Sequence, residues 1–188
     1  MARKIRMHAA ADTLTEKERN VRLFYALWPD AATRSALTEL QASIPGRVTP
    51  PEDLHLTLVF LGAQPAALLP TLQALMTELP AAAMTLRLDY LGYFPKPAIL
   101  WTGPQSPPAE LVTLQHALLG ALARHNILVD QGPRFTPHIT VARNTIAAPV
   151  APPMTPIVWR ADHIALVQST TTGTAPRYRL LASRWLAR

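Results

Sequence analysis

The sequence contains no cysteine, which excludes disulfide bonds, thiol nucleophiles and metal sites built on thiolates. It also contains no uninterrupted apolar segment near the roughly 20 residues that a membrane-spanning helix needs. The N-terminal segment MARKIRMHAAADTLTEKERN lacks the apolar stretch of a secretory signal peptide. We therefore expect a cytoplasmic protein that makes no contact with a membrane.

The chain contains enough hydrophobic residues to form a folded domain. Hydrophobic residues make up 49% of its 188 residues and charged residues 16%, so its segments can bury enough surface to offset their loss of conformational entropy. Residues 1–20 are polar and lack a clear period, and we interpret them as a flexible N-terminal extension. Residues 21–188 suffice for a single domain. Because the sequence shows no obvious apolar surface helix, we expect a monomer.

Positive charge is concentrated in the last third of the chain. The formal net charge is +6, and residues 124–188 carry eight Lys or Arg against two Asp or Glu, whereas residues 23–123 carry four against seven. A basic surface of this kind favours a polyanionic or phosphate-bearing partner. A solvated basic face without a partner explains the charge equally well.

The hydrophobic periodicity predicts the order strand, helix, strand, helix, strand, strand, helix and three further strands. Strands are predicted at residues 21–29, 50–62, 84–94, 98–104, 132–144, 157–170 and 176–186. Helices are predicted at residues 30–44, 65–80 and 108–126. This order indicates an α+β fold made of two similar halves.

A short pattern, His-x-Thr-x, occurs once in each half. It reads HLTL at residues 55–58 and HITV at residues 138–141, with the two histidines 83 positions apart, and each copy follows a segment that contains proline. A single copy on an apolar strand is usually a satisfied structural pair. Two copies in equivalent contexts point instead to one shared site.

Strand geometry gives this pattern a chemical meaning. Side chains at i and i+2 of a strand share a face, so His55 and Thr57 point one way together, as do His138 and Thr140. The residues predicted to point the other way, into the core, are Leu56, Leu58, Phe60, Ile139 and Val141. If the halves pack about a pseudo-twofold axis, two imidazoles and two hydroxyls converge on one cleft.

Such a set suits a phosphodiester. With an ordinary pKa of about 6.5, one histidine can be neutral while the other is protonated near neutral pH, as acid–base catalysis requires. The hydroxyls can donate to non-bridging phosphate oxygens. We expect no metal and no cofactor, because the alternative of a zinc site on the two histidines lacks a matching third ligand.

These residues resemble the two-histidine phosphoesterases, and most closely the RNA 2′,3′-cyclic phosphodiesterases, historically called 2′-5′ RNA ligases. The similarity extends over nearly the whole body. The matching segments are RLFYALWPD, LHLTLVFLG, LGYFPKPAILWTG, PHITVAR and a C-terminal segment of the form S…YRLLASRWL. The resemblance implies a bilobal α+β fold with two pseudo-symmetric, mainly antiparallel sheets flanked by helices around a central cleft.

The resemblance also implies the reaction, which is hydrolysis of a terminal 2′,3′-cyclic phosphate of RNA to a 2′-phosphomonoester. His55 would donate a proton to the departing 3′-oxygen and His138 would accept one from the attacking water, while Thr57 and Thr140 would hold the phosphate oxygens. From the residues alone, the acid and base roles are interchangeable. The reverse reaction, joining RNA ends through a 2′-5′ linkage, follows from microscopic reversibility.

Other candidate residues are less clearly placed by the sequence. Arg143 follows His138 by five positions and on an ideal strand faces the other way, yet at the end of the strand it could turn toward the phosphate. Tyr25 and Tyr178 are candidates for stacking on a base of the RNA.

Two other functions fit the same residues. One is a noncatalytic protein that binds RNA ends. The other is a phosphodiesterase for a small cyclic nucleotide, such as ADP-ribose 1″,2″-cyclic phosphate, or for 2′-5′-linked oligonucleotides.

Overall fold

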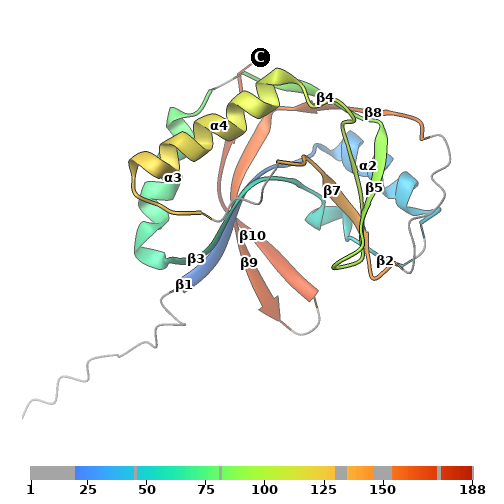
Figure 1. The fold of residues 1–188 in the computed structure, drawn as a ribbon, viewed down its shortest axis with the longest axis horizontal. Helices are drawn as coiled ribbons and strands as arrows, with labels where there is room; N and C mark the ends of the chain where they lie inside the picture. Colours follow the sequence, from blue (N-terminus) through green and yellow to red (C-terminus); the bar gives the residue numbers. More distant parts are fainter. Residues whose placement is uncertain are drawn as a thin grey trace, which may run out of the picture.

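The computed structural model describes residues 20–44, 46–80, 82–129, 135–145, 154–172 and 175–187. Apart from Asn20, which begins the first strand, the predicted N-terminal extension lies outside these residues. Figure 1 shows helices packed on mainly antiparallel strands, which confirms the α+β class.

Most strands belong to one sheet of eight. Its members are β1 (Asn20–Leu27), β2 (Arg47–Val48), β3 (Leu56–Pro65), β5 (Tyr90–Phe94), β6 (Ile99–Gly103), β7 (Ile139–Arg143), β9 (His163–Thr172) and β10 (Ala175–Trp185). The strands follow one another as β10-β9-β1-β3-β7-β6-β5, with β2 paired to β7, and every pairing is antiparallel. The remaining strands, β4 (Met84–Leu88) and β8 (Ile157–Ala161), form a second sheet of two.

The strand order reads symmetrically from the middle of the large sheet outward. Strands β3 and β7, which follow the two histidines, lie at the centre, flanked by β1 and β6 and then by β9 and β5. We expected a separate sheet in each half. Instead, the pairing of Leu56 with Ile139 joins the two halves into one sheet.

Three α-helices accompany these strands, namely α2 (Ala31–Gln41), α3 (Leu69–Glu78) and α4 (Ala109–Arg124). Helix α2 begins after Asp30, whose side chain accepts a hydrogen bond from the Thr33 N–H at 2.7 Å, as expected of an N-cap. Pro70 lies in the first turn of α3, where it costs no helical hydrogen bond. The sequence therefore predicts all three helices correctly, with ends that differ by a few residues.

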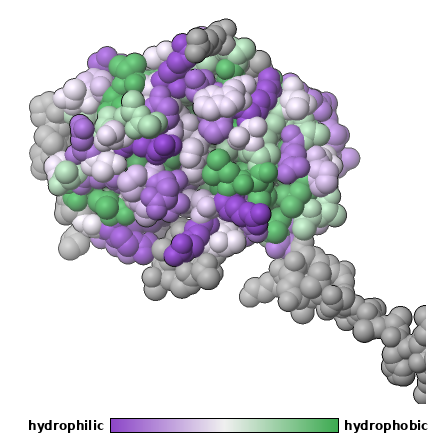
Figure 2. Space-filling view, turned by 180° about the vertical axis from the view of Figure 1, so that it is seen from behind, coloured by the Kyte–Doolittle hydropathy of each residue, from purple (hydrophilic) through white to green (hydrophobic). Residues whose placement is uncertain are grey.

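The main core lies between the helices and one face of the large sheet. Helix α4 buries Leu111, Leu114, Leu118 and Leu122, the residues whose spacing predicts this helix, in the same core as Leu56 and Ile139. Helices α3 and α4 lie side by side (Figure 1). The space-filling view in Figure 2 shows hydrophobic residues interspersed among hydrophilic ones over the rear face. The face of the sheet opposite this core carries a second, smaller cluster that includes Phe24, Trp28 and Val167.

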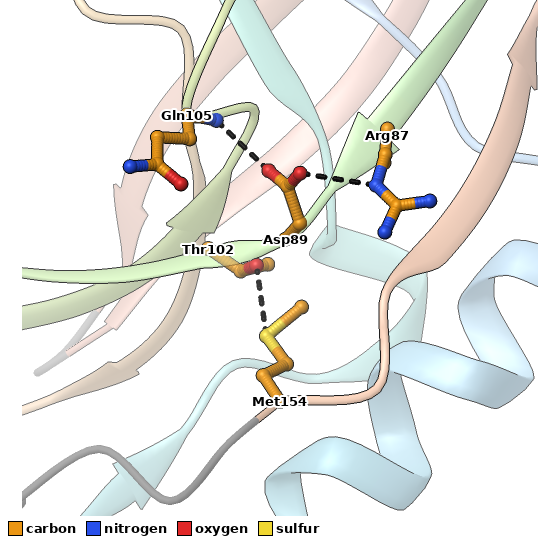
Figure 3. A network of polar contacts seen from close by, with 5 residues as sticks. All are labelled: Arg87, Asp89, Thr102, Gln105 and Met154. Atoms are coloured by element: carbon orange, nitrogen blue, oxygen red, sulfur yellow. Dashed lines mark hydrogen bonds and ion pairs between the residues drawn. The ribbon is translucent and has the colours of Figure 1, made fainter.

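Two segments that we predicted as single strands are each divided between the two sheets. Residues 84–94 form β4 and β5, with a break at Asp89, and residues 157–170 form β8 and β9, with a break at Asp162. Asp is disfavoured in strands and hydrogen-bonds nearby groups instead. The Asp89 carboxylate accepts from the Gln105 backbone N–H at 2.9 Å and pairs with Arg87 at 3.1 Å (Figure 3).

From the sequence we predicted that no segment forms a membrane-spanning helix. Among the described residues, no helix is long and apolar enough to cross a bilayer.

Candidate active site

The two histidines stand at equivalent places in the sheet, one residue before β3 and one residue before β7. The next residues, Leu56 and Ile139, pair with each other in antiparallel fashion. Continuing this register by one residue places His55 beside Thr140, and residues directly opposite in an antiparallel pair share a face. By the same register, Thr57 lies beside His138. The sheet thus brings the two patterns together on one face.

Exposure alternates as the sequence predicts. His55, Thr57, His138 and Thr140 are all partly exposed. The intervening residues Leu56, Leu58, Ile139 and Val141 are buried. The polar face of each pattern is therefore accessible to a ligand, while the apolar face anchors the strand in the core.

A bulge in β7 decides the direction of Arg143. Trp101 of β6 pairs with Thr140 and Leu100 pairs with Ala142, so Val141 is an extra residue in β7. An extra residue shifts the alternation by one, and Arg143 consequently returns to the face of Thr140. Strict alternation from Thr140 would direct the Arg143 side chain to the opposite face. The bulge therefore explains how Arg143 can face the phosphate, as we considered from the sequence.

The same bulge occurs in β3 and corrects one prediction. Tyr25 of β1 pairs with Val59 and Ala26 pairs with Thr57, so Leu58 is the extra residue. Phe60, which we predicted to face the core, is instead 61% exposed, with its ring centroid 6.0 Å from that of Phe24. Phe60 follows its histidine by five positions, as Arg143 follows His138.

Each imidazole is oriented by the same backbone contact. Nδ1 of His55 lies 2.6 Å from the carbonyl oxygen of Asp53, and Nδ1 of His138 lies 2.7 Å from that of Thr136. A carbonyl oxygen only accepts, so Nδ1 carries a proton and donates it in both rings. In the neutral tautomer, Nε2 is left with a free lone pair, which suits it to exchange a proton with a substrate.

The surroundings lower the pKa of both imidazoles. Burial is the main cause that lowers the pKa of His55 to about 4; the hydrogen bond to Asp53 opposes this shift, and the nearby Arg143 and His138 add to it. Burial and Arg143 likewise lower the pKa of His138. Both shifts favour the neutral form of each ring near pH 7. An anion between the rings would offset these positive charges and raise both pKa values.

Aromatic side chains enclose His55. Its ring stacks on Phe24 at a centroid distance of 4.8 Å and on Trp28 at 5.4 Å, and the ring of Tyr178 meets it edge-on at 4.9 Å. Burial raises the pKa of the Tyr178 hydroxyl, and the nearby Arg143 guanidinium opposes this shift. Tyr25 is different, because it is fully buried and its hydroxyl donates to the Leu72 carbonyl at 2.6 Å. Of the two tyrosines considered for stacking, only Tyr178 lies at the site.

His138 has aromatic neighbours of its own. The centroid of its ring lies 5.1 Å from that of Phe94 and 5.7 Å from that of Trp101. Trp101 lies over Gly92, where a Cβ atom would come within 2.0 Å of the indole ring. Glycine at this position therefore leaves the space that the indole occupies.

A cavity of about 160 Å³ opens beside these groups. The residues lining it include His55, Thr140, Arg143, Tyr178 and Arg47. Arg47 pairs directly with Arg143 across β2 and β7, and two like charges so placed repel each other unless an anion lies near them. The sequence did not single out Arg47, since β2 has only two residues and leaves no periodic signal.

Metal ligation is a separate question. In the parts of the chain that the structure describes, no group of three or more His, Asp or Glu side chains is arranged to hold a metal ion. The polar side chains lining the cavity include those of His55, Thr140, Arg47, Arg143 and Tyr178.

Comparison with known proteins finds relatives that cover most of the chain. The chain is 33% identical to the RNA 2′,3′-cyclic phosphodiesterase of Thermus thermophilus over 177 residues, which cover 86% of this chain and 88% of the relative. It is also 33% identical to the protein of the same name from Escherichia coli over 136 residues, covering 70% and 77%. The crystal structure of apo LigT from E. coli superposes with a TM-score of 0.79 at 29% identity, covering 90% of this chain and 99% of LigT.

A profile of the family itself also matches. Residues 28–173, which contain both His-x-Thr-x patterns, match the 2′-5′ RNA ligase superfamily. The match extends over more than half of the chain, and the Thermus relative covers most of it at 33% identity. The chain therefore belongs to the 2′-5′ RNA ligase superfamily.

Proposed function

We propose that this protein hydrolyses the terminal 2′,3′-cyclic phosphate of RNA and leaves a 2′-phosphomonoester. The observation that carries the proposal is the convergence of two identically oriented imidazoles, each beside a threonine hydroxyl, at the pairing of Leu56 with Ile139. Relatives from T. thermophilus and E. coli are named RNA 2′,3′-cyclic phosphodiesterases. LigT has also been crystallised with 3′-AMP and with phosphate.

The mechanism assigns one proton to each histidine. Nε2 of His138 accepts a proton from a water molecule as its oxygen attacks phosphorus. The P–O3′ bond breaks on the opposite side, and the departing O3′ takes a proton from Nε2 of His55. His55 must be protonated at that moment, and the charge of the bound phosphate favours this by raising its pKa. Exchange with solvent then restores both rings.

The remaining groups stabilise the phosphate. The hydroxyls of Thr57 and Thr140 donate to its non-bridging oxygens, and the guanidinium of Arg143 balances the charge that develops on them. We propose that residues 21–188 act as one bilobal domain, as a monomer in the cytoplasm, with RNA as the partner. The reverse reaction would join a cyclic phosphate end to a 5′-hydroxyl end when ends are concentrated.

The test uses a short RNA with a 2′,3′-cyclic phosphate end. We expect full conversion to the 2′-phosphate, identified by its ³¹P NMR signal, at the same rate with and without EDTA. Formation of the 3′-phosphate would contradict the mechanism, because O3′ would then not be the leaving group. Tight binding of the RNA without turnover would favour the noncatalytic alternative. A rate much higher on small cyclic nucleotides would favour the third function.

Phe60 provides a second prediction, because it lies exposed on the face of the histidines, next to Phe24. We propose that it stacks on the base next to the cyclic phosphate. Stacking on an aromatic ring is worth about 1–3 kcal/mol per base, so Phe60→Ala should raise KM for adenosine 2′,3′-cyclic phosphate roughly tenfold, with little change in kcat. Val158→Ala, which also removes an exposed apolar side chain, is the matched control. An unchanged KM in Phe60→Ala would exclude the stack.

A further inference from the structure

An exposed pair of aromatic rings lies at the edge of the large sheet, and the proposed mechanism uses neither of them. Trp185, the last residue of β10, is 68% exposed. Its indole stacks on the imidazole of His163, the first residue of β9, with the ring centroids 4.5 Å apart and an angle of 15° between the planes. The other three tryptophans are at most 8% exposed. Trp185 is therefore the one indole of this protein that is open to a partner.

Strand pairing places the Trp185–His163 pair in line with the active site. Trp185 lies directly opposite His163 in the pairing of β10 with β9. The backbone N–H of Trp28 donates to the His163 carbonyl at 2.8 Å, which extends the pairing of β9 with β1 by one residue. Trp28 in turn stacks on His55, with an angle of 4° between the planes. The four rings therefore form one row across β10, β9, β1 and β3.

Burial shows which face of the sheet carries this row. Residues directly opposite each other in antiparallel strands share a face, and neighbours along a strand point to opposite faces. Ile164 and Leu186, which follow the two rings of the pair, are buried in the main core. Trp28 belongs instead to the smaller cluster on the other face, where it contacts His55. The Trp185–His163 pair thus lies on the face of the active site.

The distance along the row indicates what the pair can meet. Three strand spacings, about 14 Å in all, separate β10 from β3. In the proposed function, the phosphate holds the reacting nucleotide at His55. A ring this far from His55 meets the nucleotides upstream of the reacting one, because they are joined to it through their phosphates.

The charges of the same strands favour such a chain. In residues 154–172 and 175–187, the charged side chains are Arg160, Arg177, Arg179 and Arg184 against Asp162 alone. Arg184 donates to the carbonyls of α3 and its C-terminal end, whereas Arg177 and Arg179 are exposed on β10. Proteins that bind single-stranded nucleic acids combine positive charge for the phosphates with aromatic rings on which bases stack.

We propose that the Trp185–His163 pair is a stacking platform for a base upstream of the cyclic phosphate, so that single-stranded RNA is preferred over a mononucleotide. This inference rests on the function proposed above. The imidazole supports the indole from one side and orients it before the RNA binds, which reduces the entropy lost on binding. The other side of the indole is open to a base. Every base has a π-face, so the platform should accept any sequence.

The first test compares substrates of one to four nucleotides that end in a 2′,3′-cyclic phosphate. In the wild type, we expect KM to fall roughly tenfold at the length that reaches Trp185, the size of one stacking contact. Trp185→Ala should lose this fall and keep the wild-type kcat and KM for the mononucleotide, which also shows that the variant is folded. Trp185→Phe should retain most of it. An abasic nucleotide at the upstream position should abolish the fall in the wild type.

Fluorescence gives a second readout that needs no turnover. Because Trp185 is the exposed tryptophan, a base stacked on it should quench the wild-type emission. The probe is a four-nucleotide RNA that already ends in a 2′-phosphate, and it should quench Trp185→Phe much less. Failure of the wild type to hydrolyse cyclic phosphates would contradict the proposed function alone, since this titration would still test the platform.

Tyr90→Ala is the matched control, because it removes a 46% exposed ring from β5 at the other edge of the sheet. This variant should keep the wild-type dependence of KM on length. Loss of the dependence in Tyr90→Ala but not in Trp185→Ala would overturn the proposal and place the upstream chain at that other edge. A KM independent of length in the wild type would also overturn it. So would RNA binding that is unchanged in Trp185→Ala while self-association of the protein is lost, since the pair would then join two copies of the chain.

Discussion

His138→Ala is expected to lower kcat/KM for a 2′,3′-cyclic phosphate by about a thousandfold, and His55→Ala by a similar factor. Positioned acid–base groups contribute roughly 10² to 10⁴ in rate, and each of these rings presents Nε2 to the site while the backbone holds Nδ1. His125→Ala, which changes an exposed histidine at the end of α4, should leave the rate unchanged. Full activity in either active-site variant would remove the basis of the mechanism.

A sulfur substitution separates the roles of the two rings. When the bridging 3′-oxygen is replaced by sulfur, the departing thiolate needs no proton, because a thiol is far more acidic than an alcohol. His55→Ala should then regain most of its lost activity, whereas His138→Ala should not, since attack by water still needs a base. Recovery in His138→Ala instead would show that the acid and the base are exchanged.

Arg143→Met should lower kcat/KM by about a hundredfold and shift both limbs of the pH–rate profile to higher pH. The loss reflects removal of a charged donor to the phosphate, whose effect is of the order known for oxyanion-stabilising groups. The shift arises because the charge of Arg143 lowers the pKa of both histidines. Without that charge, the base His138 loses its proton at higher pH, and the acid His55 keeps its proton to higher pH. Both limbs therefore move in the same direction.

Arg143→Lys is the matched control for the pH effect. Lysine keeps the positive charge but not the planar pair of donors, so the profile should stay near its wild-type position while the rate remains reduced. A pH profile that is identical in Arg143→Met and the wild type would show that the guanidinium does not act on the two imidazoles. The rates at several pH values distinguish these cases.

The sequence predicts the two central strands, β3 and β7, and helix α4 better than the details of strand pairing. The two His-x-Thr-x patterns predict which face of β3 and β7 is polar, because alternation in a strand is a local property. Helix α4 is predicted for the same reason, from Leu111, Leu114 and Leu118. The acid and base roles came only from resemblance to a family, since two similar imidazoles carry no local sign of their function.

What the sequence does not predict depends on pairing between distant strands. The direction of Phe60 and Arg143 changes because β3 and β7 each contain an extra residue opposite their neighbours, and no local pattern announces a bulge. The breaks at Asp89 and Asp162 were missed because each Asp lies between two segments that both have strand character. The low pKa of His55 arises from burial and from charges brought near it by the fold.

The near-symmetry of the sheet raises the question of how the site tells the two ends of its substrate apart. Two histidines related by a local twofold axis would accept a small phosphate equally well in either orientation. The equivalent positions five residues after them break this equality, since one carries an aromatic ring and the other a guanidinium. A nucleotide is itself asymmetric, with a planar base at one end and an anionic phosphate at the other. Exchanging Phe60 and Arg143 should therefore turn the ligand around, so that the two imidazoles swap their tasks without either having moved.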